Sequence, residues 1–148
     1  MKQIVLSPHT FDGLLKHLVD VEERQNQIIE EFSLKATEEY REYTNIFKNY
    51  LNQLRGLVER SNINDGTDDS IPIITIGTLV QVINTNNRKE HAFHIVSPYY
   101  QRSSNGDVSC LSPVGRALLL RKAGEEVAVE APGGMFRYEI QSIKYVGE

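Results

Sequence analysis

Acidic side chains gather near the middle of the first half of the chain, on either side of residues 33–37. Two glutamates precede this segment and two follow it: Glu30, Glu31, Glu38 and Glu39. Carboxylate oxygens are the ligands that hard cations such as Mg²⁺ prefer, so metal binding is one interpretation of these glutamates. The plainer interpretation is a solvated helix end, because the helix dipole favours acidic residues in the first turn. We favour that interpretation, and we predict no metal site and no cofactor.

Three other side chains are of types that bind metals or act as nucleophiles: His91, His94 and Cys110. The histidines lie three residues apart in a predicted strand, which puts them on opposite faces and makes shared metal ligation awkward. Cys110 lies in an apolar stretch and is expected to be a small buried residue rather than a nucleophile. We therefore predict no catalytic residue, and a protein that is not an enzyme.

Two amphipathic helices are predicted to position the acidic segment. Ser7 and Pro8 supply a cap and a proline at the first helical position. The apolar residues that follow alternate spacings of three and four, as the seam of a coiled coil requires. Interrupted only by Gln25, these residues are Phe11, Leu14, Leu18, Val21, Ile28 and Phe32, then Ala36, Tyr40, Tyr43, Phe47, Tyr50, Leu54 and Leu57.

The connection between the two seams, residues 33–37, contains no glycine or proline. One continuous helix is therefore an alternative that the pattern alone leaves open. Two seams of matched length are what an antiparallel helical hairpin needs, and we favour the hairpin.

The second half of the chain has strand patterns. Beyond a polar, acidic linker, residues rich in β-branched side chains predict strands at Ile71–Ile83 and Glu90–Val96, joined by the turn Asn84–Asn87. A polar loop over residues 97–107, with an edge segment as an option, leads towards Ser112. The predicted domains are a coiled-coil hairpin at residues 1–63, a linker at residues 64–70 and a β-rich domain at residues 71–148, an α+β fold.

A compact unit closes the chain. Ser112 and Pro113 are predicted to cap and start a short helix through Leu118, since a serine oxygen accepts from the free amides of the first turn. Polar and apolar residues then alternate over Glu126–Glu130 and over Phe136–Ile140. The Pro132, Gly133 and Gly134 turn between these segments predicts a hairpin.

The same residues carry a family resemblance. The run SPVGRALL at residues 112–119, followed by GEEV, APGG and an alternating strand, resembles the C-terminal domain of the GreA/GreB transcript cleavage factors. The resemblance extends more weakly over nearly the whole chain, and it implies a helical hairpin ahead of an FKBP-like domain. It also implies a partner, bacterial RNA polymerase, with the C-terminal domain at the rim of the secondary channel and the hairpin entering the channel.

The resemblance implies which residues contact the polymerase: Ser112, Pro113, Arg116, Ala117 and Leu118, with Val114 and Gly115 in the variable places of the motif. For Ala117 and Leu118 the alternative is that both side chains simply pack inside the domain. For Ser112 the alternative is a purely structural helix cap.

The hairpin tip departs from the family. Cleavage factors carry there a motif of the form Asp-Leu-Lys-Glu-Asn-Ala-Glu-Tyr, whose two carboxylates hold the polymerase's second Mg²⁺ and its attacking water. The corresponding residues in this chain are Ser33, Leu34, Lys35, Ala36, Thr37, Glu38, Glu39 and Tyr40. Ser33 replaces the aspartate and Ala36 replaces the glutamate, so both carboxylates are missing. Together with a shorter hairpin, this resembles Rnk-type and anti-Gre-type relatives, and it implies an elongation regulator that does not stimulate cleavage.

Three other functions stay open at this point. Displaced tip glutamates would make the chain an active cleavage factor, and a coiled coil that pairs with a second copy would make it a scaffold. An FKBP-like prolyl isomerase would need an aromatic-lined pocket, whereas this chain has no tryptophan and only scattered tyrosine and phenylalanine in that domain.

Composition favours a protein partner. The net charge is −4 and no polybasic patch stands out, so autonomous nucleic-acid binding is not expected. A single cysteine excludes a disulfide within the chain, and no membrane-spanning run or secretory signal is predicted. We expect a cytoplasmic monomer.

Overall fold

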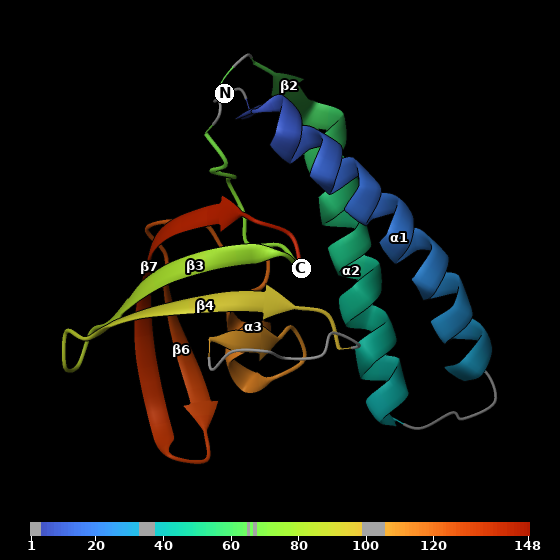
Figure 1. The fold of residues 1–148 in the computed structure, drawn as a ribbon. Helices are drawn as coiled ribbons and strands as arrows, with labels where there is room; N and C mark the ends of the chain where they lie inside the picture. Colours follow the sequence, from blue (N-terminus) through green and yellow to red (C-terminus); the bar gives the residue numbers. More distant parts are fainter. Residues whose placement is uncertain (1–3, 33–37, 65, 67, 99–105) are drawn as a thin grey trace. The chain divides into compact units, whose positions relative to one another are not determined.

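The chain folds as two compact units, Met1–Thr67 and Asp68–Glu148. The computed structural model describes residues 4–32, 38–64, 66, 68–98 and 106–148, with residues 25–32, 39, 40 and 131 described by their backbone alone. Helices form the first unit and a curled mixed sheet dominates the second (Figure 1), which confirms the predicted α+β class. No helix within the described residues is long and apolar enough to span a membrane.

The first unit is built on two long helices. Its elements are β1 (Ile4–Leu6), α1 (Pro8–Phe32), α2 (Glu38–Arg60) and β2 (Ser61–Ile63). The two helices lie side by side (Figure 1), and the short strands β1 and β2 pair in parallel where α1 begins and α2 ends. Two helices, rather than one continuous helix, are therefore present.

The predicted seams of α1 and α2 bury their apolar side chains. Those that are buried are Leu14, Leu18 and Val21 from α1 and Tyr50, Leu54 and Leu57 from α2. Phe11, Tyr43 and Phe47 are only half-buried, so they lie at the margins of the seam. The remaining predicted seam residues are outside the described side chains: Gln25, Ile28, Phe32, Ala36 and Tyr40.

The start of α1 follows the predicted cap. The backbone N–H of Thr10 donates to Ser7 Oγ at 3.1 Å, and the two hydroxyls lie 2.9 Å apart. Pro8 is the first residue of the helix, where its missing N–H costs nothing. Both polar side chains are buried and satisfied by each other.

The second unit is a five-stranded sheet with one short helix. Its elements are β3 (Thr78–Asn84), β4 (Glu90–Val96), β5 (Asp107–Ser109), α3 (Pro113–Leu118), β6 (Glu126–Ala131) and β7 (Gly134–Tyr145). The strand order is β5-β4-β3-β7-β6, antiparallel throughout except for the parallel pair β4 and β5. Side chains from one face of this sheet form the core, with Val80, Val82, Ile95, Ile140 and Ile143 nearly inaccessible.

The predicted strand at Ile71–Ile83 is wrong over its first seven residues, because β3 begins only at Thr78. Pro72 has no N–H to give to a ladder, and Gly77 has φ of +91°. Ile71, Ile74 and Ile76 are nevertheless buried, as an irregular segment rather than a strand. Their β-branched side chains produced a strand pattern that the backbone does not follow.

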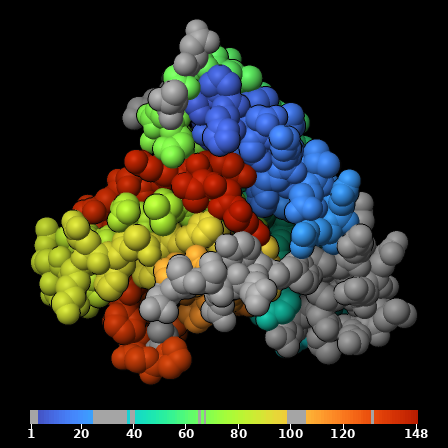
Figure 2. All heavy atoms as spheres, in the orientation of Figure 1, coloured from blue at the N-terminus to red at the C-terminus, as the bar shows by residue number. Residues whose placement is uncertain are grey.

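The predicted hairpin of β3 and β4 is present, and its turn lies where the sequence predicts it. Asn84 Oδ1 accepts from the N–H of Asn86 at 2.9 Å, so the asparagine side chain closes the turn. The turn lies on the surface of this unit (Figure 2, yellow-green to yellow), and its residues 86–89 are exposed. Beyond the second predicted hairpin, β7 continues past Ile140 to Tyr145 across a bulge opposite Gln81 and Val82.

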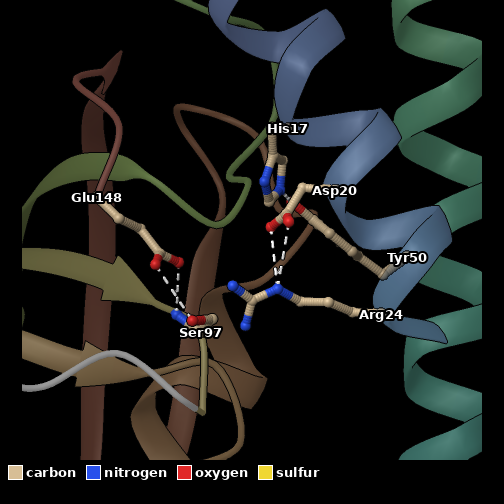
Figure 3. A network of polar contacts seen from close by, with 6 residues as sticks. All are labelled: His17, Asp20, Arg24, Tyr50, Ser97 and Glu148. Atoms are coloured by element: carbon tan, nitrogen blue, oxygen red, sulfur yellow. Dashed lines mark hydrogen bonds and ion pairs between the residues drawn. The ribbon is translucent and has the colours of Figure 1, made fainter. Parts of the chain in front are cut away.

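A histidine–tyrosine pair lies inside the helical unit. His17 Nε2 of α1 and the Tyr50 hydroxyl of α2 are 2.7 Å apart, and Tyr50 is fully buried (Figure 3). Burial lowers the pKa of His17 to about 4, although the nearby Asp20 carboxylate acts in the opposite direction. His17 is therefore uncharged at neutral pH.

We expect the helical unit to lose stability as the pH falls from 6.5 towards about 4. In that window the unfolded chain binds a proton at His17 that the folded chain does not. The free energy of unfolding therefore decreases as the pH decreases. The loss should reach roughly 2 kcal/mol, allowing for solvent screening of a half-buried group. Urea unfolding followed by circular dichroism at several pH values measures it. His17→Gln should flatten this part of the profile, and identical profiles for both proteins would contradict the assignment.

Candidate functional site

The helix α3 is fixed at its first residue by a compact hydrogen-bond network. Gly115 N–H donates to Ser112 Oγ at 3.1 Å, which makes Ser112 the N-cap that the sequence predicts. The Ser112 hydroxyl in turn donates to the carbonyl of Ser109 at 2.7 Å, and the Ser112 N–H reaches the same carbonyl at 3.0 Å. The start of α3 is thereby tied to the end of β5.

Gly115 lies unusually close to that same turn. A Cβ added to Gly115 would be 1.9 Å from the carbonyl oxygen of Ser109 and 2.9 Å from the Cα of Cys110. Only a residue without a side chain fits this contact. The resemblance implies a variable place of the motif at Gly115; in this chain the packing requires a glycine there. A glycine inside a six-residue helix is unfavourable on propensity alone, and that was the available signal.

The helix has one solvent face and one core face. Pro113 and Arg116 are exposed and Ala117 is half-buried, and a turn of 3.6 residues places the three on one side. Leu118 is 0% exposed, so its side chain packs in the core and does not face a partner. Of the residues implied to contact a partner, Pro113, Arg116 and Ala117 are available to one directly. Ser112 is half-buried and holds the helix start.

The surface near α3 carries positive charge. Arg116, Arg121 and Lys122 are all exposed, and Arg121 Nη1 lies 3.5 Å from the carboxylate of Glu125. Exposed ion pairs of this kind contribute little to stability. The positive charge matters for binding instead, because an acidic or neutral partner surface would complement it and a basic surface would repel it.

The predicted hairpin-tip residues Ser33, Leu34, Lys35 and Ala36 lie outside the described residues. Glu38 is exposed at the first position of α2, and Glu39 is described by its backbone alone. Of these residues, Glu38 alone has a described side chain.

The other candidate residues, Cys110, His91 and His94, have surroundings that indicate a packing role. Burial and the nearby Glu148 carboxylate raise the pKa of the Cys110 thiol to about 12, so it is protonated and unsuited to nucleophilic attack. His91 stacks on Phe93, whereas His94 is on the other face of β4. Within the described part of the chain, no group of three or more His, Cys, Asp or Glu side chains is arranged to hold a metal ion.

His94 joins the segment after β7 to the sheet. Its Nδ1 lies 3.1 Å from Asp107 Oδ1 of β5, and its Nε2 lies 2.7 Å from the carbonyl oxygen of Gly147. Next to it, the Glu148 carboxylate accepts from the Ser97 N–H at 2.8 Å (Figure 3). These contacts hold the end of β4 beside β5, which leads directly into the Ser109 turn.

Three rings predicted to be scattered, Phe93, Phe136 and Tyr138, come together with His91 on the core face of the sheet. His91 and Phe93 of β4 stack at 5.9 Å, and Tyr138 of β7 meets both rings edge-on. Phe136 stacks beside Tyr138 at 6.5 Å. Tyr138 is only 7% exposed, whereas the other three rings are half-buried, so the cluster lies at the margin of the core.

Comparison with known proteins finds relatives of this chain among transcription elongation factors. Residues 69–145 match the family described as transcription elongation factor GreA/GreB, C-terminal domain. Transcription elongation factor GreA of Thermosipho melanesiensis is 31% identical over 132 residues, which cover 87% of this chain and 83% of that protein. GreA of Thermodesulfovibrio yellowstonii is 32% identical over 105 residues, 71% of this chain and 66% of the relative.

A solved structure shares the fold over nearly the full length. It is the prokaryotic transcription elongation factor GreA/GreB from Nitrosomonas europaea, with a TM-score of 0.50 and 22% identity. The match covers 96% of this chain and 99% of that one.

We expect Gly115→Ala to destabilise the second unit by roughly 2–3 kcal/mol, because the new methyl group would force α3 away from the Ser109 carbonyl. Thermal unfolding of the full chain measures the loss. Gly133→Ala is the matched control: its Cβ would lie 3.5 Å from the Phe136 ring, an ordinary contact, and little change is expected. An equal effect of both substitutions would show that the close approach is not what α3 depends on.

Proposed function

This chain belongs to the GreA/GreB family of transcription elongation factors, and on that premise we propose that it binds bacterial RNA polymerase and regulates elongation without stimulating transcript cleavage. In this proposal the second unit is the anchor, at the rim of the secondary channel, and the helical hairpin enters the channel. The protein is a regulator of the polymerase and not itself an enzyme.

The observation that carries the anchor assignment is the presentation of α3. Pro113 and Arg116 face solvent, while Ser112 and Gly115 hold the helix against the Ser109 turn. A surface fixed before binding loses little conformational freedom in the complex, which favours affinity. Ala117 lies on the same side of the helix as the two exposed side chains and is proposed to contact the polymerase. The buried Leu118 is proposed to support the helix from below.

The proposed lack of cleavage rests on residue chemistry at the hairpin tip. A metal-bound water needs oxygen ligands held to a fraction of an ångström. Ser33 offers a neutral hydroxyl and Ala36 a methyl group where cleavage factors of the family carry carboxylates. The proposed role is therefore occupation of the channel, in competition with factors that do promote cleavage.

We expect the double substitution Pro113→Ala with Arg116→Ala to weaken binding to core RNA polymerase by about tenfold or more, since exposed anchor residues dominate interface energies. Equilibrium binding of the labelled full chain measures this. Arg137→Ala is the control, because it removes an exposed arginine from β7 and leaves α3 unchanged. A double variant that still folds and binds like the unsubstituted protein would contradict the anchor assignment.

We expect the protein to leave transcript cleavage unchanged in backtracked elongation complexes, and in excess to suppress cleavage by a genuine cleavage factor. The reason is the missing pair of metal ligands. Gel analysis of labelled transcripts measures both effects, with the genuine factor alone as the positive control. Robust cleavage by this protein would show that Glu30, Glu31, Glu38 or Glu39 supplies the ligands, and the proposed mechanism would be abandoned.

A further inference from the structure

The chain reverses directly after α3 in a turn that favours glycine at its third position. Leu119 has φ of −55° and ψ of 130°, Leu120 has φ of +70°, and the Arg121 N–H donates to the Leu118 carbonyl at 3.0 Å. These are the features of a type II turn, in which the third residue must adopt positive φ. Leucine occupies that position here.

A leucine in this conformation costs free energy that glycine would avoid, because its Cβ crowds the backbone. Hydrogen bonds on both sides hold the conformation in place. The Leu120 N–H donates to the Ile74 carbonyl at 2.8 Å, and the Ile74 N–H donates to the Arg121 carbonyl at 2.9 Å. Ile74 is fully buried, so the turn is fixed to the core of the unit.

The strained leucine is not fully buried. In the run Leu118, Leu119 and Leu120, the first two side chains belong to the core. Leu120 remains partly exposed to solvent. Backbone strain that packing alone does not explain is concentrated at functional positions in proteins. The apolar side chain of Leu120 is therefore presented near the surface, two residues after α3 ends.

We propose that Leu120 is a further contact residue for the polymerase. It follows the C-terminal end of α3 and would add an apolar contact to those of Pro113 and Arg116. This inference rests on the proposed function. Its partner would be an apolar side chain on the polymerase surface that α3 meets, since a leucine side chain contributes to an interface by excluding water. The strained turn would fix its direction in advance.

Two substitutions separate the side chain from the strain. Leu120→Ala keeps a Cβ at positive φ and removes the apolar group, whereas Leu120→Gly removes both. We expect each to weaken binding of the full chain to core RNA polymerase by about tenfold. We also expect Leu120→Gly to melt no lower than Leu120→Ala, because glycine tolerates the turn. Arg88→Gly is the matched control, since Arg88 has φ of +62° in the exposed turn between β3 and β4 and should leave affinity unchanged.

The unsubstituted protein must bind in the same assay, and its failure to bind would reject the proposed function itself. If it binds and both Leu120 variants bind equally well, the contact is refuted. A loss of affinity in Leu120→Ala that Leu120→Gly does not share would also refute it, because Leu120→Gly lacks the leucine side chain as well. Loss in both variants, with the melting temperature of Leu120→Gly at or above that of Leu120→Ala, is the result that supports the contact.

Discussion

The second unit depends on the approach of Gly115 to the carbonyl oxygen of Ser109. No side chain separates α3 from the turn after β5, so the helix, its cap at Ser112 and the buried Leu118 take one position relative to the sheet. That position decides which residues meet solvent. Pro113 and Arg116 are displayed because the opposite side of a six-residue helix is fully used in packing. A larger residue at 115 would disturb the surface that the proposed function needs.

The helical unit solves a different problem. Buried apolar side chains from α1 and α2 form its seam, and the His17–Tyr50 pair is a polar contact among them. An uncharged histidine satisfies the tyrosine hydroxyl without placing a charge among apolar side chains. The proposed lack of cleavage follows from residue type: Ser33 and Ala36 stand where the family resemblance implies two carboxylates, and neither would supply the ligands of a cleavage factor's metal site.

Much of this architecture followed from sequence because local and tertiary preferences agree. The caps at Ser7 and Ser112 and the strand Glu90–Val96 are confirmed. The helical seams are confirmed at the six positions whose side chains are buried, from Leu14 to Val21 and from Tyr50 to Leu57. The strand prediction failed over residues 71–77 because β-branched side chains indicate burial, and an irregular segment can be buried just as a strand can. The need for glycine at 115 arises from a close approach to the Ser109 carbonyl, and a glycine inside a short helix was the only local signal of it. The positive φ at Leu120 depends on hydrogen bonds with Ile74, a distant segment, which no local pattern encodes. The gathering of four aromatic rings depends on strand order for the same reason.

Hydrogen–deuterium exchange of the full chain, with and without core RNA polymerase, tests the central claim most directly. The account predicts that polymerase slows exchange most strongly in peptides covering residues 112–121, since α3 and its turn would be the anchor. Exchange in peptides that cover β6 and β7 should change little and serves as the internal reference. Protection confined to those peptides or to the helical unit, with exchange at residues 112–121 unchanged, would contradict the account.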